Sequence, residues 1–155
     1  LSLCPSLSDH YSLTDHYIFH ALEHFNNPIG MLKSIKNQLK ENGRIVIEVP
    51  HANDFLISTV NCKPFIDFTL WSQHLILHTR ESLQKFLLEA DFSDILIEGV
   101  QRYPLSNHLT WLSDAIPGGH QSNLSLIDSH DLHVSYENSL RKIDATDTLV
   151  AIATA

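Results

Sequence analysis

The spacing of apolar residues predicts a strand, a helix and a second strand in the first third of the chain. Residues 17–19 form a short apolar and aromatic run, which is typical of a brief strand. Asn27-Pro28 follows, and we expect a helix to begin there because Asn is a favoured N-cap and Pro a favoured first helical residue. Apolar residues then recur at helical spacing, and Gly43 is expected to end the helix. This stripe consists of Ile29, Leu32, Ile35 and Leu39.

The next apolar run, residues 45–49, is nearly continuous in branched residues and ends at Pro50. Such a run is typical of a parallel strand that is buried on both faces. Strand, helix and strand with short connections predict a right-handed βαβ unit. Loops at the carboxyl ends of parallel strands carry function in such sheets, so we expect functional residues in 20–27 and from His51 onward.

The second half of the chain predicts further helices and two more strands. Residues 51–79 form a long connection rich in aromatic and apolar residues, which we expect to pack and to be functional or to carry short helices. Thr79 is expected to cap a helix. The buried stripe of that helix consists of Leu83, Phe86, Leu87 and Ala90. Strands are expected at 95–100 and 148–154, with a helix over about 124–143 between them. We expect these two strands to pair antiparallel at one edge of the sheet, so the predicted fold class is α/β.

Composition excludes several classes of protein. The formal net charge of −8, from 18 acids against 10 bases, argues against a nucleic-acid partner. The hydrophobic fraction of 43% is ordinary for a globular domain. Cys4 and Cys62 make no disulfide framework, so we expect a reducing, cytoplasmic location. We also expect no membrane span and no signal peptide, because no apolar run is long enough for either.

His20, Glu23 and His24 match H-x-x-E-H, the zinc signature of one class of metalloprotease. That chemistry needs a continuous helix, which places both histidines and the glutamate on one face. Here the motif begins directly after a predicted strand, and a new helix is expected at Pro28. The spacing therefore leaves no room for the helix that a protease of this class requires.

The same residues resemble a different family. Leu22-Glu23-His24 after a strand, then an Asn-Pro-capped helix and the phrase LKENGRIVIEVP at 39–50, are similar to the second half of class I S-adenosylmethionine-dependent methyltransferases. Residues 73–92 resemble that family's phrase HlrhfTpesLkklleeaGF, with Asp91 where the family commonly has Gly. Residues 101–120 and the closing TDTLVAIAT resemble a bacterial subgroup. The resemblance runs from about residue 15 to the end of the chain.

The resemblance implies the C-terminal half of a Rossmann-like methyltransferase sheet, with parallel strands, helices and an antiparallel last strand. We expect a connector over 1–14 and a half-domain over 15–155, with a helical insertion at about 102–147. None of the five glycines falls in a G-x-G pattern, so the family's glycine-rich cofactor loop has no counterpart here. A half sheet leaves one parallel edge uncovered, and we expect a homo-oligomer or a missing N-terminal half to cover it.

S-adenosylmethionine is the cofactor that the resemblance implies. Phe19, His20, Ala21 and Leu22 correspond to the loop that packs on the methionine end of this cofactor. The alternative is that these residues only connect a strand to a helix.

Three more residues are expected to be catalytic: His74, Glu23 and His24. His74 corresponds to a histidine near the acceptor in relatives that methylate sugars, although Gln73 stands where some relatives have an acid. A histidine there can take a proton from an acceptor hydroxyl. Glu23 and His24 are expected to line the reaction cleft or, alternatively, to hold the loop. In some relatives E-x-x-E-H at this position binds a divalent metal, so His20, Glu23 and His24 with His74 form an alternative ligand set. We expect no metal.

Two functions follow from these patterns. The first is methyl transfer from S-adenosylmethionine to a small or sugar-like acceptor, with His74 as the base. The second is a truncated, non-catalytic methyltransferase-like domain that dimerises or binds a partner through its open sheet edge.

Overall fold

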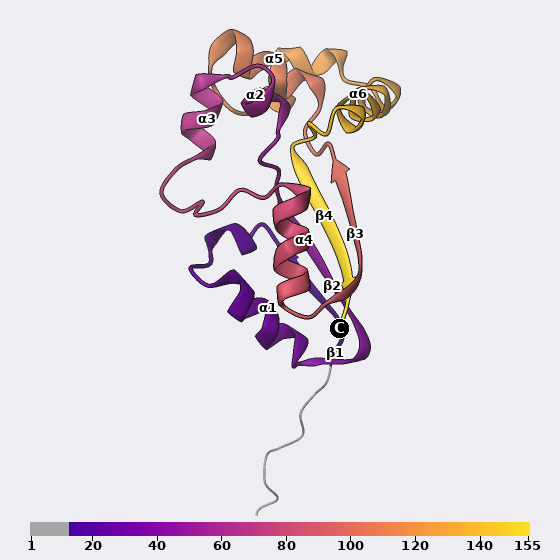
Figure 1. The fold of residues 1–155 in the computed structure, drawn as a ribbon. Helices are drawn as coiled ribbons and strands as arrows, with labels where there is room; N and C mark the ends of the chain where they lie inside the picture. The colour runs from indigo at the N-terminus through magenta and orange to yellow at the C-terminus, as the bar shows by residue number, and fades with distance from the viewer. Residues whose placement is uncertain (1–12) are drawn as a thin grey trace, which may run out of the picture.

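The computed structural model describes residues 13–155, which form a four-stranded sheet with helices on one face and at one end (Figure 1). Its strands and α-helices are β1 (Leu13–Phe19), α1 (Pro28–Lys36), β2 (Leu39–Pro50), α2 (Phe55–Ser58), α3 (Lys63–Thr69), α4 (Arg80–Glu89), β3 (Ser93–Val100), α5 (Leu105–Asp114), α6 (His130–Lys142) and β4 (Thr148–Thr154). Three 3-10 turns complete it: η1 (Leu22–His24), η2 (Gly119–Gln121) and η3 (Asn123–Ile127). Across the described residues, none of the helices is both long enough and apolar enough to span a membrane.

The sheet has the strand order β1-β2-β4-β3. β1 runs parallel to β2, whereas β4 is antiparallel to both β2 and β3. The predicted α/β class with an antiparallel last strand is therefore confirmed, and so is the predicted antiparallel pair. β4 lies between β2 and β3, so β3 forms one edge of the sheet and β1 the other.

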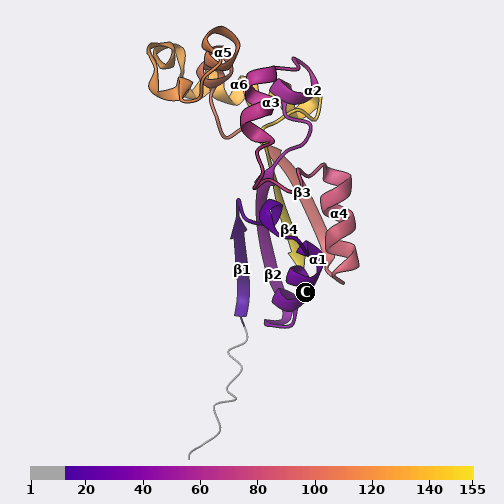
Figure 2. The same ribbon diagram turned by 90° about the vertical axis from the view of Figure 1, so that its left-hand side faces the viewer.

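The core lies between the sheet and helices α1 and α4, which cover the same face (Figure 2). Ile45, Ile47 and Val49 of β2 are fully buried against these helices. The prediction that β2 is buried on both faces is wrong, because Val46 on the opposite face stays partly exposed. No helix among the described residues covers that face over β2 (Figure 2).

An apolar row crosses this second face. Tyr17 pairs with Val46, Val46 with Ile152, and Ile152 with Leu96, so the row spans all four strands. Tyr17 is 57% exposed, Leu96 53% and Ile152 37%. The sheet therefore presents an uncovered apolar strip that runs to the free edge of β1.

Two predicted boundaries near the start of the chain are wrong. The helix predicted to extend to Gly43 ends at Lys36 instead. Leu39 already belongs to β2, where it pairs with Leu13 of β1. Gly43 lies inside β2 instead, where the pairing with β1 is irregular, and a Cβ there would lie 2.9 Å from the Lys40 carbonyl oxygen. The expected connector over 1–14 lies outside the described residues except for its last two, Leu13 and Thr14, which are part of β1.

The second half follows the predictions more closely. The 51–79 connection carries the short helices α2 and α3, the predicted strand at 95–100 begins two residues earlier, and β4 has its predicted bounds. The helix predicted over about 124–143 is present as α6, but its predicted start is wrong: η3 ends at Ile127, and α6 begins only after Ser129, whose hydroxyl accepts from the Leu132 N–H. Two extended residues, Asp128 and Ser129, separate these elements. Cys62 is buried and forms no disulfide with any residue that the structure describes, and Cys4 lies outside those residues.

Thr79 caps α4 as predicted, and its loss tests how the helix is held. Its hydroxyl accepts from the Ser82 N–H at 3.1 Å, while the Ser82 hydroxyl accepts from the Thr79 N–H at 2.9 Å. We expect Thr79→Ala to lower the free energy of unfolding by about 1 kcal/mol, because it removes one of these bonds and weakens the other. Urea unfolding measures the change. Thr59→Ala, at an exposed position, is the control and should change stability by less than about 0.5 kcal/mol; equal effects of the two would contradict the capping role.

Candidate functional site

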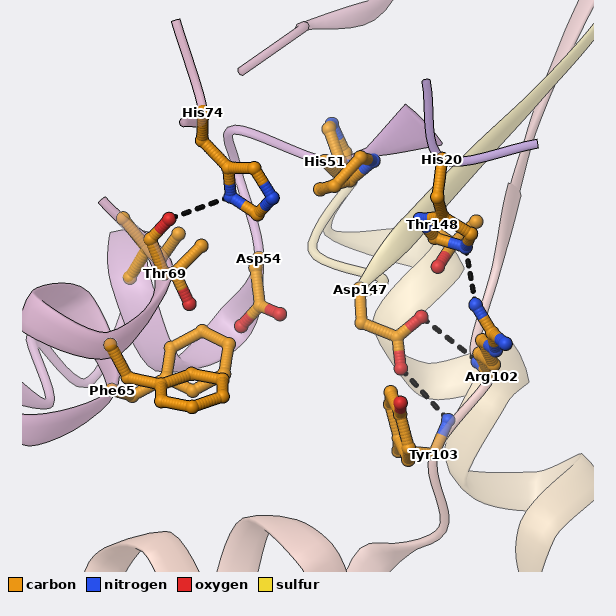
Figure 3. Close-up of a pocket in the computed structure, with 13 residues that line it drawn as sticks. His20, His51, Asp54, Phe65, Thr69, His74, Arg102, Tyr103, Asp147 and Thr148 are labelled. Atoms are coloured by element: carbon orange, nitrogen blue, oxygen red, sulfur yellow. Dashed lines mark hydrogen bonds between the residues drawn. The ribbon is translucent and has the colours of Figure 1, made fainter. Parts of the chain in front are cut away.

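A cavity of about 330 Å³ opens at the carboxyl ends of β1 and β2 (Figure 3). Its wall combines aromatic and aliphatic side chains with histidine, aspartate and arginine, and it is contributed by segments far apart in the sequence. The lining residues are His20, Pro50, His51, Asp54, Ile57, Phe65, Phe68, Thr69, His74, Arg102, Tyr103, Asp147 and Thr148. The position agrees with the expectation that functional loops follow these two strands.

The expected cofactor loop follows β1 directly. Phe19 is 57% exposed, and His20 turns the chain with a left-handed φ of 45°. The His20 Nε2 lies 2.7 Å from the Glu48 carboxylate of β2 and also contacts the Arg102 guanidinium (Figure 3). Leu22 is fully buried in the core, whereas Phe19, His20 and Ala21 remain accessible. The loop is therefore anchored by Leu22 and presents its first three residues.

The three expected catalytic residues lie together, although 50 residues separate Glu23 and His24 from His74. The Leu75 N–H donates to the Glu23 carbonyl at 2.9 Å, which fastens the segment after α3 to η1. Candidate ligand atoms of Glu23, His24 and His74 all lie within 4.8 Å of one another. His74 also lines the cavity, so this cluster borders it.

The Glu23 carboxylate is buried without a hydrogen bond. Only 1% of its side chain is exposed, and neither oxygen has a hydrogen-bond partner within residues 13–155. The nearest cationic candidates are His20 Nδ1 and His24 Nε2, each 3.8 Å from Oε1, which is beyond hydrogen-bond distance. A buried carboxylate without such bonds is energetically costly.

Sequence reasoning missed two aspartates of the cavity wall, of which Asp54 is buried and Asp147 partly buried. Burial raises the pKa of the Asp54 carboxyl to about 7, although the Leu56 N–H donates to it at 2.6 Å. Burial also raises the pKa of Asp147, which accepts from the N–H groups of Arg102 and Tyr103 at 2.9 Å. Asp54 lies shortly after β2 and directly before the apolar Phe55-Leu56, which is the pattern of an N-cap and the signal that locates it in the sequence.

The raised pKa of Asp54 predicts a pH-dependent stability. Its folded-state pKa of about 7 exceeds the ordinary value of about 3.9, so the folded chain binds this proton more tightly than the unfolded chain. Its contribution is therefore present below pH 4 and is lost as the pH rises through 7. Asp54→Asn keeps the cap and removes the charge. We expect the variant to match the wild type near pH 4 and to exceed its stability by about 2 to 4 kcal/mol at pH 8.

Urea unfolding at a series of pH values measures this difference. Asp94→Asn, at an exposed position, is the control and should show no such trend. A stability difference between Asp54→Asn and wild type that does not change with pH would contradict the burial argument.

Comparison with known proteins places the fold in a family. A family model described as a methyltransferase domain matches residues 17–97. No curated protein matches the chain. Among solved structures, a SAM-dependent methyltransferase of Archaeoglobus fulgidus has 21% identity and a TM-score of 0.57, over 94% of this chain and 60% of its own. A SAM-dependent methyltransferase of Thermotoga maritima has 13% identity and a TM-score of 0.55, over 91% and 55%. Phosphoethanolamine N-methyltransferase 2 of Haemonchus contortus has 13% identity and a TM-score of 0.50, over 91% and 33%.

These similarities agree with the motifs in the sequence. The chain spans about 60% or less of the length of these structures, and at such identities the likeness concerns the fold. The family model covers more than half of the 155 residues and includes the end of β1 and all of α1, β2 and α4. This chain therefore belongs to the methyltransferase domain family.

Proposed function

We propose that this chain carries the acceptor side of an S-adenosylmethionine-dependent methyltransferase that acts on a small or sugar-like molecule. The observation that carries the proposal is the cavity at the carboxyl ends of β1 and β2, next to the expected cofactor loop. Its volume of about 330 Å³ is at the lower end of the range for small-molecule sites, which begins near 300 Å³. Aromatic walls with a few polar groups suit a molecule that has both an apolar face and hydroxyl or amine groups.

The residues that would hold the cofactor lie along the free edge of β1. A second hollow there, of about 420 Å³, is lined by residues of β1 and of the first helix, including Phe19, Ala21 and Met31. Because Phe19 and Ala21 belong to this hollow and His20 belongs to the cavity, the loop separates two adjoining spaces. The bound cofactor supplies the sulfonium methyl group, and the loop would orient it toward the cavity. Alignment of two reactants in this way contributes several kcal/mol to catalysis.

His74 is the proposed proton acceptor. Its Nδ1 lies 2.7 Å from the Thr69 carbonyl oxygen, and because a carbonyl only accepts, this nitrogen carries the hydrogen (Figure 3). The neutral ring then has its lone pair on Nε2, on the side away from Thr69. Glu23 and His24 adjoin this ring, with the His24 and His74 centroids 5.0 Å apart. A base held in this way can accept the proton of an acceptor hydroxyl as the methyl group is transferred.

A second, non-catalytic function is favoured by the uncovered strip across the sheet. β1 has a strand partner on one side only among the residues that the structure describes, and the strip ends at its exposed Tyr17. If β1 paired with a strand of a second copy of this chain, or of another chain, both the free edge of β1 and the apolar strip would be covered. Sedimentation of the chain tests this: association that Tyr17→Lys weakens supports it, and a monomer at all concentrations contradicts it.

Phe19 gives the test of the cofactor proposal. We expect calorimetric titration with S-adenosylmethionine to show binding to the wild-type chain, and Phe19→Ala to weaken it about tenfold through lost apolar contact. Leu88→Ala is the matched control, because Leu88 is 55% exposed on α4, away from the loop, and its loss should leave binding unchanged. Absence of heat at millimolar cofactor, or equal affinities of the two variants, would contradict a cofactor site at this loop.

A further inference from the structure

We infer that the cavity recognises its acceptor by a positively charged amine, which the Asp54 carboxylate receives beside the aromatic wall that helix α3 provides. This inference rests on the proposed function and deepens it, because it narrows a small or sugar-like acceptor to one that carries a protonated amine. The hydroxyl that His74 would deprotonate and the amine that Asp54 would hold are then two groups of the same molecule.

Asp54 is a buried carboxylate of the cavity wall without a side-chain partner. It is 3% exposed, and its Oδ1 accepts from the Leu56 N–H at 2.6 Å. None of the side chains of residues 13–155 donates a hydrogen bond to this carboxylate or forms an ion pair with it. Figure 3 shows it pointing into the space that Phe65 and Asp147 border. A cation that enters this space would therefore meet a carboxylate that the protein leaves without a counter-charge.

Asp147, the second aspartate of the cavity wall, is already satisfied by the protein. It accepts from the N–H groups of Arg102 and Tyr103 at 2.9 Å and from Gln101 Nε2 at 2.8 Å. These bonds hold the segment after β3, from which Arg102 and Tyr103 line the cavity. Asp147 therefore shapes the wall and adds negative charge near Asp54, and the free capacity to bind a cation lies with Asp54.

The basic groups of the cavity wall are engaged elsewhere or neutral. Arg102 is the single arginine or lysine among the described residues that line the cavity, and its guanidinium lies 3.5 Å from Glu48 and contacts His20. Burial is the main cause that lowers the pKa of His51, so this ring is neutral near pH 7. His74 is held by a backbone carbonyl through its Nδ1. The wall thus supplies no cation to the buried aspartate.

Aromatic rings line the cavity together with this carboxylate. Phe65 and Phe68 of α3 belong to the wall, and each ring centroid lies 5.2 Å from that of the buried Trp111, which holds both in place. The ring of Tyr103 lies on the opposite side of the cavity (Figure 3). Aromatic faces attract organic cations, and a carboxylate beside them accepts the hydrogen bonds that an ammonium group donates. The two features together suit an amine attached to an apolar or sugar-like body.

Charge is the reason that an amine fits this wall better than a hydroxyl or an anion. A neutral group at Asp54 would leave the carboxyl either ionised without a counter-charge or protonated, because burial raises its pKa to about 7. An alkyl amine is protonated at neutral pH, as the lysine side chain is, and donates up to three hydrogen bonds. An anionic group would be repelled by the same carboxylate. Bound amine and ionised Asp54 therefore stabilise each other.

Benzylamine and benzyl alcohol test the inference, because they share a ring and differ in the charged group. We expect NMR titration of the full chain at pH 8 to show that the wild type binds benzylamine about tenfold more tightly than benzyl alcohol. Asp54→Asn keeps an oxygen for the Leu56 N–H and removes the charge, so it should bind the two probes about equally. Asp94→Asn, at an exposed position, is the matched control and should keep the preference. Circular dichroism checks that both variants are folded.

The pH dependence of benzylamine binding gives a second measurement. Ionised Asp54 attracts the ammonium group, so the affinity of the wild type should rise between pH 6 and pH 8, and this rise should be smaller in Asp54→Asn. Asp147 and Tyr136 lie near the same carboxylate. Burial raises the pKa of Tyr136 to about 12, so this side chain stays neutral, and the comparison of the two proteins isolates Asp54 from Asp147.

Equal binding of the two probes by the wild type, or a preference for benzylamine that Asp54→Asn retains, would overturn the inference. These titrations need no cofactor, so they are separate from the S-adenosylmethionine titration. Binding of the cofactor without a preference for amines would leave the proposed function in place and remove this inference. A preference for amines that depends on Asp54, without cofactor binding, would support the recognition of amines and contradict methyl transfer by this chain.

Discussion

Strand β2 is the element on which the arrangement of the site depends. It pairs in parallel with β1 on one side and antiparallel with β4 on the other, so the carboxyl end of β1, the carboxyl end of β2 and the start of β4 meet at one end of the sheet. The His51 N–H donates to the Asp147 carbonyl at 2.9 Å, which fastens the chain after β2 to the start of β4. β2 therefore brings the segment after β1, the segment after β2 and the start of β4 together at the cavity, whose wall includes residues from His20 to Thr148.

Buried charge is the feature that distinguishes this end of the sheet from the rest. Glu23, Asp54 and Asp147 are carboxyls in or beside the cavity; the first two are buried and Asp147 is partly buried. Asp147 is stabilised by backbone N–H groups, and the pKa of Asp54 is raised to about 7 by its burial. Glu23 has no hydrogen-bond donor to either carboxylate oxygen among the described residues. Perturbed and unpaired groups of this kind gather at functional sites.

Local signals in the sequence predicted much of the fold. The Asn27-Pro28 start of α1 and the Thr79 cap of α4 depend on neighbouring residues only, and both are present. Leu39 continued the helical spacing but belongs to β2, because its position is decided by pairing with Leu13. Likewise, the composition of β2 does not reveal that one of its faces stays uncovered. Such outcomes depend on contacts between distant segments, which periodicity does not report.

The site was predictable only where it depends on neighbouring residues. Glu23 and His24 are adjacent and follow a strand, so their place near the functional end could be inferred. Their meeting with His74 depends on a backbone hydrogen bond between Leu75 and Glu23, and the burial of Asp54 depends on the helices around it. A crystal structure of the chain with S-adenosylhomocysteine tests the proposed arrangement most directly. We predict that the homocysteine end lies against Phe19 and Ala21 with its sulfur facing the cavity that His74 lines; a ligand bound elsewhere, such as along β3, would contradict it.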